Sequence, residues 1–231
     1  MLAVLIVTTA APALGADRRY TVTDYDRVQV EGPFAVVLKT GKAPSARAVG
    51  SNQATDRISL EVQGRTLKVR PNRSAWGGDP DKDVGPVSIE LTTHGLRAAS
   101  VTGSGSLSID KVKAMRFEAT LSGSGKLSVG SIEADNLSLG QLGAGAISIA
   151  GKVKSFRGTV QGSGNLDGSA LTAEDLQLNA DTSGAVALNA GRSAKIVSSG
   201  SGETTILGKV ACTVKTLGSG RVRCGNGSDQ R

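Results

Sequence analysis

Catalysis and metal binding require particular residue types at particular spacings, and few residues of this chain meet that requirement. The first candidate is the single histidine, His94. It stands in Thr93-His94-Gly95, a sequence typical of a turn. A Ser-His-Asp mechanism would have to use this imidazole as its general base, and a general base needs positioned neighbours. The sequence marks no nucleophile as its partner, so we predict no catalytic residues and no enzymatic activity.

Four acidic residues have a spacing close to that of a calcium loop. Asp79, Asp81 and Asp83 alternate, and Glu90 follows at the distance of a twelfth loop position. However, the glycine that makes the sharp turn of such a loop falls one position late, at Gly85. We therefore expect a solvated acidic loop rather than a metal site, and we expect no cofactor.

Glycine-rich corners recur every 18–20 residues through the second half of the chain. They are Gly103-Ser104-Gly105, Gly123-Ser124-Gly125, Gly143-Ala144-Gly145, Gly162-Ser163-Gly164, Thr182-Ser183-Gly184, Gly200-Ser201-Gly202 and Gly218-Ser219-Gly220. A fixed period of this length is typical of a solenoid, in which each repeat buries its apolar face against its neighbours. We assign the corners to turns in which glycine allows positive φ, because a phosphate-binding loop needs a third glycine and a following helix.

Apolar residues occupy fixed positions relative to each corner. Six positions before it lie Phe117, Leu137, Phe156, Leu176, Ala194 and Cys212. Four positions after it lie Leu107, Leu127, Ile147, Leu166, Val186, Thr204 and Val222. Further apolar columns follow at a spacing of two, which is the strand period. This pattern therefore predicts that each coil has two short strands, with their apolar side chains inward, and a third short side.

Stacked coils of this kind pair each strand in parallel with the next, and parallel crossovers are overwhelmingly right-handed. The sequence thus predicts an all-β fold, a right-handed parallel β-helix of about seven coils of 18–20 residues over residues 96–224. Residues 17–95 lack the repeat but alternate like strands, and we expect them to form a β cap on the open end. We expect residues 225–231 to form a flexible tail.

The two cysteines, Cys212 and Cys224, both fall in inward columns, six positions before and six after the last corner. They should face each other across the terminal coil. In an oxidising compartment such a pair favours a disulfide, and two buried free thiols are the alternative.

The first residues predict export. Residues 1–16 have the features of a signal peptide, with an apolar run over 2–11 and small residues before Asp17, although no Lys or Arg precedes the run. A buried N-terminal strand is the alternative. No later stretch has 18 apolar residues, so we expect no transmembrane span in the mature chain. The periplasm and the cell surface both remain open as locations.

Composition narrows the choice of partner. Aromatic residues make up 3% of the 231 residues, so a groove paved with Trp and Tyr is not expected. The net charge of +7 attracts polyanions, but the Lys and Arg residues are scattered. We therefore expect no nucleic-acid partner.

The chain resembles one family in a specific set of motifs. These are the string of corners, the Leu107-Ser108-Ile109 and Leu127-Ser128-Val129 steps, the lead-in Val87-Ser88-Ile89-Glu90-Leu91 to Leu96, and the Arg65-Thr66-Leu67-Lys68-Val69 arm followed by Trp76. The family is the head GIN domain, described as a "putative auto-transporter adhesin", and the resemblance covers roughly residues 25–224. It implies a β-helical protein of the bacterial envelope.

Together these observations predict an exported, non-enzymatic β-solenoid that works by adhesion or binding on its outer faces. Outward residues there include Lys126, Arg157, Glu118 and Asn165. The partner is unknown, and an envelope polysaccharide or a surface protein fits the prediction. The alternatives are a protein that binds or processes acidic polysaccharide, since parallel β-helices host such enzymes, and a periplasmic sensor of envelope stress.

Overall fold

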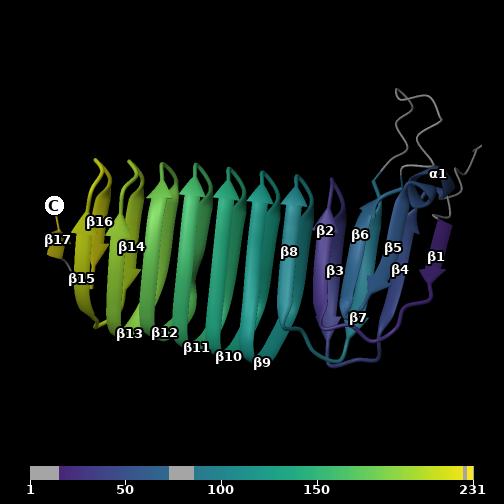
Figure 1. The fold of residues 1–231 in the computed structure, drawn as a ribbon, viewed down its shortest axis with the longest axis horizontal. Coiled ribbons are helices and arrows are strands. Elements are labelled where there is room, and N and C mark those ends of the chain that lie inside the picture. Colours follow the sequence, from purple (N-terminus) through teal and green to yellow (C-terminus); the bar gives the residue numbers. More distant parts are fainter. Residues whose placement is uncertain (1–15, 73–85, 226–227, 231) are drawn as a thin grey trace, which may run out of the picture.

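The computed structural model describes residues 16–72, 86–225 and 228–230. The structure is nearly all β, with 74% strand and 3% helix, and it forms a β-solenoid of about six turns. Figure 1 shows the strands side by side along the long axis, with the N-terminal strands at one end and the C-terminal strands at the other. The predicted β-helical fold is therefore confirmed. Within the described residues, no helix is long and apolar enough to cross a bilayer.

Five long strands form the regular centre of the solenoid. They are β9 (Ser106–Gly123), β10 (Lys126–Gly143), β11 (Ala146–Gly162), β12 (Asn165–Thr182) and β13 (Ala185–Ser198). Each pairs in parallel with its sequence neighbours, so that Leu137 of β10 lies opposite Phe117 of β9 and Phe156 of β11. These three side chains are at most 1% exposed, and they stack inside the coil as the periodicity predicts.

The corners use glycine for two different reasons. Gly123 has a φ of +113°, a conformation that L side chains rarely adopt. Gly125 has no positive φ, but a Cβ there would collide with the carbonyl oxygen of Gly105 in the preceding coil. Positive φ, the predicted reason, therefore applies to the first glycine of the corners from Gly103 to Gly162. The second glycine is needed because neighbouring corners approach too closely for a side chain.

The N-terminal strands continue the solenoid, but their order in space differs from their order in the chain. They are β2 (Arg27–Glu31), β3 (Ala35–Thr40), β6 (Thr66–Pro71), β7 (Ser88–Thr93) and β8 (Ala98–Gly103). β2 pairs in parallel with both β6 and β8, and β3 pairs in parallel with both β7 and β9. The β2–β3 coil therefore lies between the β6–β7 coil, which follows it in sequence, and the β8–β9 coil.

Antiparallel strands flank the N-terminal coils. They are β1 (Ala16–Tyr20), β4 (Ser45–Gly50) and β5 (Ile58–Gln63), and the short helix α1 (Asn52–Asp56) connects the last two. β4 pairs with β7 and with β1, whereas β5 pairs with β6. These pairings extend the sheet at this end, and the capping role expected of residues 17–95 stays a prediction. Residues 1–15 of the predicted signal peptide lie outside the described residues.

Shorter strands finish the solenoid at the other end. They are β14 (Glu203–Leu207), β15 (Ala211–Thr216), β16 (Arg221–Cys224) and β17 (Ser228–Gln230). β14 and β15 pair in parallel with β13, and β16 pairs in parallel with β14. β17, within the segment expected to be a flexible tail, pairs antiparallel with β16.

Candidate functional site

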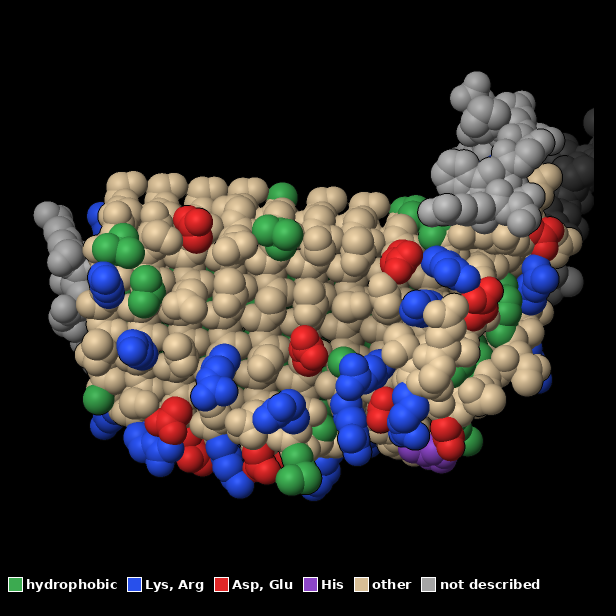
Figure 2. Space-filling view, viewed as in Figure 1, with side chains coloured by type: hydrophobic (Ala, Val, Ile, Leu, Met, Phe, Trp, Pro, Cys, Tyr) green, Lys and Arg blue, Asp and Glu red, His purple; other side chains and the backbone are tan. Residues whose placement is uncertain are grey.

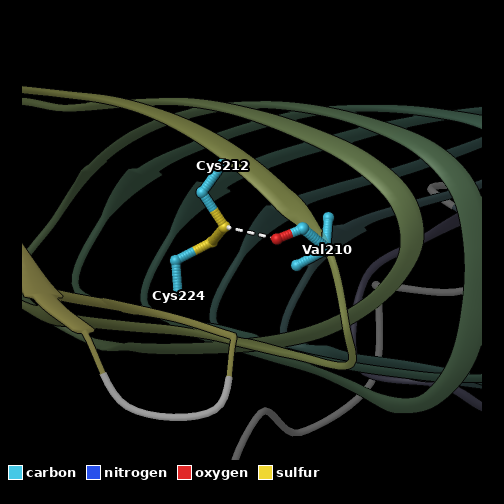
Figure 3. Close-up of a disulfide and its surroundings, with 3 residues drawn as sticks. All are labelled: Val210, Cys212 and Cys224. Atoms are coloured by element: carbon cyan, nitrogen blue, oxygen red, sulfur yellow. Dashed lines mark hydrogen bonds between the residues drawn. A yellow bond between two sulfur atoms is a disulfide. The ribbon is translucent and has the colours of Figure 1, made fainter.

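The two cysteines have a structural place at the C-terminal end. Cys212 of β15 and Cys224 of β16 form a disulfide, with their Cα atoms 6.4 Å apart. Figure 3 shows the bridge beside the carbonyl oxygen of Val210, 3.7 Å from the Cys212 sulfur. This is a contact rather than a hydrogen bond, because a disulfide sulfur carries no proton. Cys224 is buried, but Cys212 is exposed because, in the part of the chain that the structure describes, only β13 pairs with β15.

The other residues singled out for chemistry do not form a catalytic or metal centre. His94 is 68% exposed, with its Nε2 3.7 Å from the Oδ1 of Asp24. The calcium candidates Asp79, Asp81 and Asp83 lie outside the described residues. In the ranges that the structure describes, no three His, Cys, Asp or Glu side chains are placed to hold a metal ion.

The outward residues named from the sequence lie on the two broad faces. Glu118 and Arg157 are two positions apart in one outward column, with Ser138 of the coil between them. They border a shallow hollow of about 360 Å³. Lys126 and Asn165 begin β10 and β12 on the other face, where the Oδ1 of Asn165 accepts a hydrogen bond from the N–H of Ala185 at 2.9 Å.

Charged side chains gather instead along the short third side of the coil, opposite the glycine corners. Figure 2 shows them along the lower edge of the molecule, whereas the upper edge carries few. We call this side the charged edge. Its members are Lys111, Lys113, Arg116, Glu133, Asp135, Lys152, Lys154, Glu174, Asp175 and Arg192.

In-register pairing gives the charged edge an alternating order. Lys113, Glu133 and Lys152 are direct neighbours in three successive coils. The Nζ of Lys113 lies 3.3 Å from the Oε1 of Glu133, and the Nζ of Lys154 lies 2.7 Å from the Oδ1 of Asp135. That hydrogen bond raises the pKa of Lys154. These exposed pairs are individually weak, so their main effect is to fix side-chain positions.

One further pair ends this pattern at β13. Arg192 donates to both carboxylate oxygens of Asp175, and the hydroxyl of Ser193 donates to Oδ1 at 2.7 Å. The hydrogen bond from Arg192, with that from Ser193, lowers the pKa of Asp175 to about 2. These bonds therefore favour the charged form of the Asp175 carboxyl.

Between the charged side chains runs a groove of about 690 Å³. Its floor is the in-register column of Ala114, Ala134 and Val153, whose small or buried side chains leave the groove open. The groove crosses four coils, from Lys113 to Glu174. Its walls carry lysines and carboxylates in equal number, three of each.

At its N-terminal end the groove joins a hollow of about 460 Å³, since Lys113, Ala114 and Met115 line both. We call this the basic hollow. Its charged lining consists of Arg65, Arg97, Lys113 and Arg116, with Asp24, Asp26 and the largely exposed His94. Four basic side chains thus face two carboxylates.

The basic hollow is organised around Asp26, which is 8% exposed. Arg65, Asp26 and Arg97 immediately precede β6, β2 and β8, three strands that lie side by side. The Nε of Arg65 donates to the Oδ2 of Asp26 at 2.9 Å, and the Nε of Arg97 lies 3.6 Å from the same oxygen. Backbone bonds from Asp26 N–H to Arg65 and from Arg97 N–H to Asp26 lock the three strand starts together.

Tyr25 fixes the floor beside it. Its ring is buried, and its hydroxyl donates to the carbonyl oxygen of Thr92 at 2.7 Å. Burial raises the pKa of this phenol, so it remains a neutral donor. No pattern in the sequence predicted this hollow. The groove, in contrast, could have been recognised from the sequence, because charged residues recur every 18–20 residues on the third side of the coils.

Solved structures support the fold. A "putative adhesin" from Bacteroides fragilis is 17% identical, with a TM-score of 0.79 over 91% of this chain and 96% of that one. A "putative lipid binding protein" from Parabacteroides distasonis is 24% identical, with a TM-score of 0.72 over 92% and 97%. A "putative adhesin" from Parabacteroides merdae is 15% identical, with a TM-score of 0.71 over 92% and 97%. At these identities the likeness shows the fold alone.

A comparison with curated proteins found no match. The family comparison is more informative, because a family model matches residues 24–209, most of the chain that forms the solenoid. The corners, the inward columns and the parallel coils all lie within or next to this range. The chain therefore belongs to the family described as "Putative auto-transporter adhesin, head GIN domain".

Proposed function

We propose that this chain is an exported, non-enzymatic binding scaffold of the bacterial cell envelope, of adhesin-like type. The observation that carries the proposal is the groove along the charged edge, which crosses four coils in one direction. Each coil adds one row of outward side chains at a step of about 4.8 Å. An extended ligand lying in the groove would meet the same kind of contact repeatedly.

Such repetition suits adhesion. Single surface contacts are weak, but contacts made by one continuous ligand add up, because the later ones form at high effective concentration. The in-register sheet holds the charged side chains at fixed separations, so less ordering is needed on binding. The predicted signal peptide over residues 1–16 and the disulfide support export, because disulfides persist in oxidising compartments.

Protease treatment of intact cells of the native bacterium tests this proposal. We expect the mature chain, processed near residue 16, to be degraded while a periplasmic marker protein stays intact. Degradation only after the outer membrane is opened would contradict surface adhesion and favour a periplasmic binding or sensing role. Recovery of an unprocessed chain in the cytosol would refute the proposal altogether.

Attachment of cells supplies the functional half of the test. Cells that lack the gene should attach less to polysaccharide-coated or protein-coated surfaces than the parent strain. Restoring the intact gene should restore attachment. Equal attachment with and without the gene, on every surface, would refute the adhesion function.

A further inference from the structure

The basic hollow gives the scaffold a specific ligand class. We propose that it binds one acidic sugar unit, through a carboxylate or sulfate group, and that the rest of the acidic glycan follows the groove. This inference rests on the proposed binding function and names its ligand.

The first argument is charge. Lys113 lines both the hollow and the groove, and beyond it the groove carries two lysines and three carboxylates, so this part has no excess of positive charge. In the hollow, Arg65, Arg97, Lys113 and Arg116 outnumber Asp24 and Asp26. The preference for an anion is therefore concentrated at one end of the groove.

The second argument is the type and state of these cations. The side chains of Arg65 and Arg97 are 65% and 73% exposed, although both approach Asp26. Their guanidinium groups thus keep solvent-facing donors. Arg116 is exposed and has no ion pair with any other described residue. The planar guanidinium group donates two parallel N–H bonds to a pair of carboxylate or sulfate oxygens, which an ammonium group cannot do.

The third argument is the buried carboxylate that lines the hollow. The Oδ2 of Asp26 is bonded to Arg65, but its Oδ1 is buried and accepts no hydrogen bond from the described residues. A buried acceptor without a donor is costly, so a ligand hydroxyl that reached Oδ1 by displacing the groups that cover it would stabilise the complex. An anion that also carries hydroxyl groups meets both requirements, and a sugar acid or a sulfated sugar is such an anion.

Size and continuity agree with this assignment. A volume of about 460 Å³ lies in the range of small-molecule sites and accommodates a sugar ring. Met115, 80% exposed, lies where the hollow opens into the groove and offers an apolar surface to a ring. The groove then leads away along the coils, so a polymer leaves the hollow without crossing a wall.

Calorimetric titration of the purified mature chain tests the inference. The probes are an oligogalacturonate, a sulfated oligosaccharide and a neutral oligosaccharide of the same length, and inorganic phosphate. We expect at least one of the two acidic oligosaccharides to bind, with an affinity that falls as the salt concentration rises. The neutral oligosaccharide should not bind. The tighter of the two acidic probes identifies carboxylate or sulfate as the preferred group.

Matched variants locate the site. Arg116→Ala and Arg97→Ala should each weaken binding at least tenfold. Arg157→Ala removes the same charge from an exposed position on a broad face, and it should change affinity less than twofold. Asp26→Asn removes a negative charge from the hollow but leaves a weaker hydroxyl acceptor, so it should strengthen phosphate binding more than binding of the acidic sugar. If that variant fails to fold by circular dichroism, Arg116→Ala decides alone.

Three results would overturn the inference. They are failure of every acidic oligosaccharide to bind, equal weakening by Arg157→Ala and Arg116→Ala, and inorganic phosphate binding as tightly as the sugars. None of these touches the cell-surface and attachment measurements, so the proposed function would stand or fall separately.

Discussion

Two glycines of the same coil should respond in opposite ways to one substitution, Gly→Ala. At Gly125 the new Cβ would meet the backbone carbonyl oxygen of Gly105, with the Cγ1 of Val101 at 3.3 Å. That carbonyl also accepts the N–H of Lys126 at 2.9 Å, so the corner cannot open without straining this bond. Overpacking costs about 1–3 kcal/mol and a lost hydrogen bond about 1 kcal/mol, so we expect a loss of about 2–4 kcal/mol.

Gly140 is the matched control. Its nearest neighbour would be the Cγ2 of Thr120 at 3.8 Å, which is ordinary contact, and its φ is not positive. Alanine there restricts the unfolded chain and should stabilise the fold by about 0.4–1 kcal/mol. Urea unfolding followed by circular dichroism would measure both free energies of unfolding, and the difference should be about 4 kcal/mol. Equal stability of the two variants would refute the close approach of successive corners.

Three further changes test other parts of the structure. Leu137→Ala leaves a cavity between Phe117 and Phe156 and should cost about 3 kcal/mol, whereas Leu142→Ala, 56% exposed in the same coil, should cost under about 0.5 kcal/mol in the same urea assay. Reducing the Cys212–Cys224 bond, which spans 12 residues, should cost about 3 kcal/mol, and hydrogen exchange should locate the loss in β15 and β16 while β10 and β11 stay protected. The carboxyl of Asp175 should titrate near pH 2 by NMR, and Arg192→Ala should raise its midpoint towards 3.8. Since the folded pKa is the lower one, this group stabilises the fold above about pH 4, and the contribution disappears as pH falls towards 2.

The regular half of the fold follows from the sequence because each coil repeats one local pattern. The inward column through Phe117, Leu137 and Phe156 could be indexed from the corners alone, and the structure buries all three. Cys212 belongs to that column by position yet lies exposed, because burial in a solenoid comes from the next coil and no second strand of the described residues pairs with β15. Periodicity predicts which way a side chain points, but only the neighbouring coil decides whether it is covered.

The pairing of the N-terminal strands could not be predicted in this way, because these strands belong to no repeat. Their strands could be recognised by alternation, but β2 pairs with β6 and β8, which lie far along the chain. The sequence of one strand does not show which distant strand it pairs with, because the register depends on both partners together.

The basic hollow depends on this same non-local arrangement. Because β2 lies between β6 and β8, the residues that precede these strands, Arg65, Asp26 and Arg97, become neighbours in space. In sequence they are separated by dozens of residues and belong to no repeat. The first regular coil then adds Lys113 and Arg116, which lie on the part of β9 that forms the charged edge. A site with excess positive charge thus arises at the junction of irregular and regular coils, while the repeating coils beyond it, which carry no such excess, extend the groove.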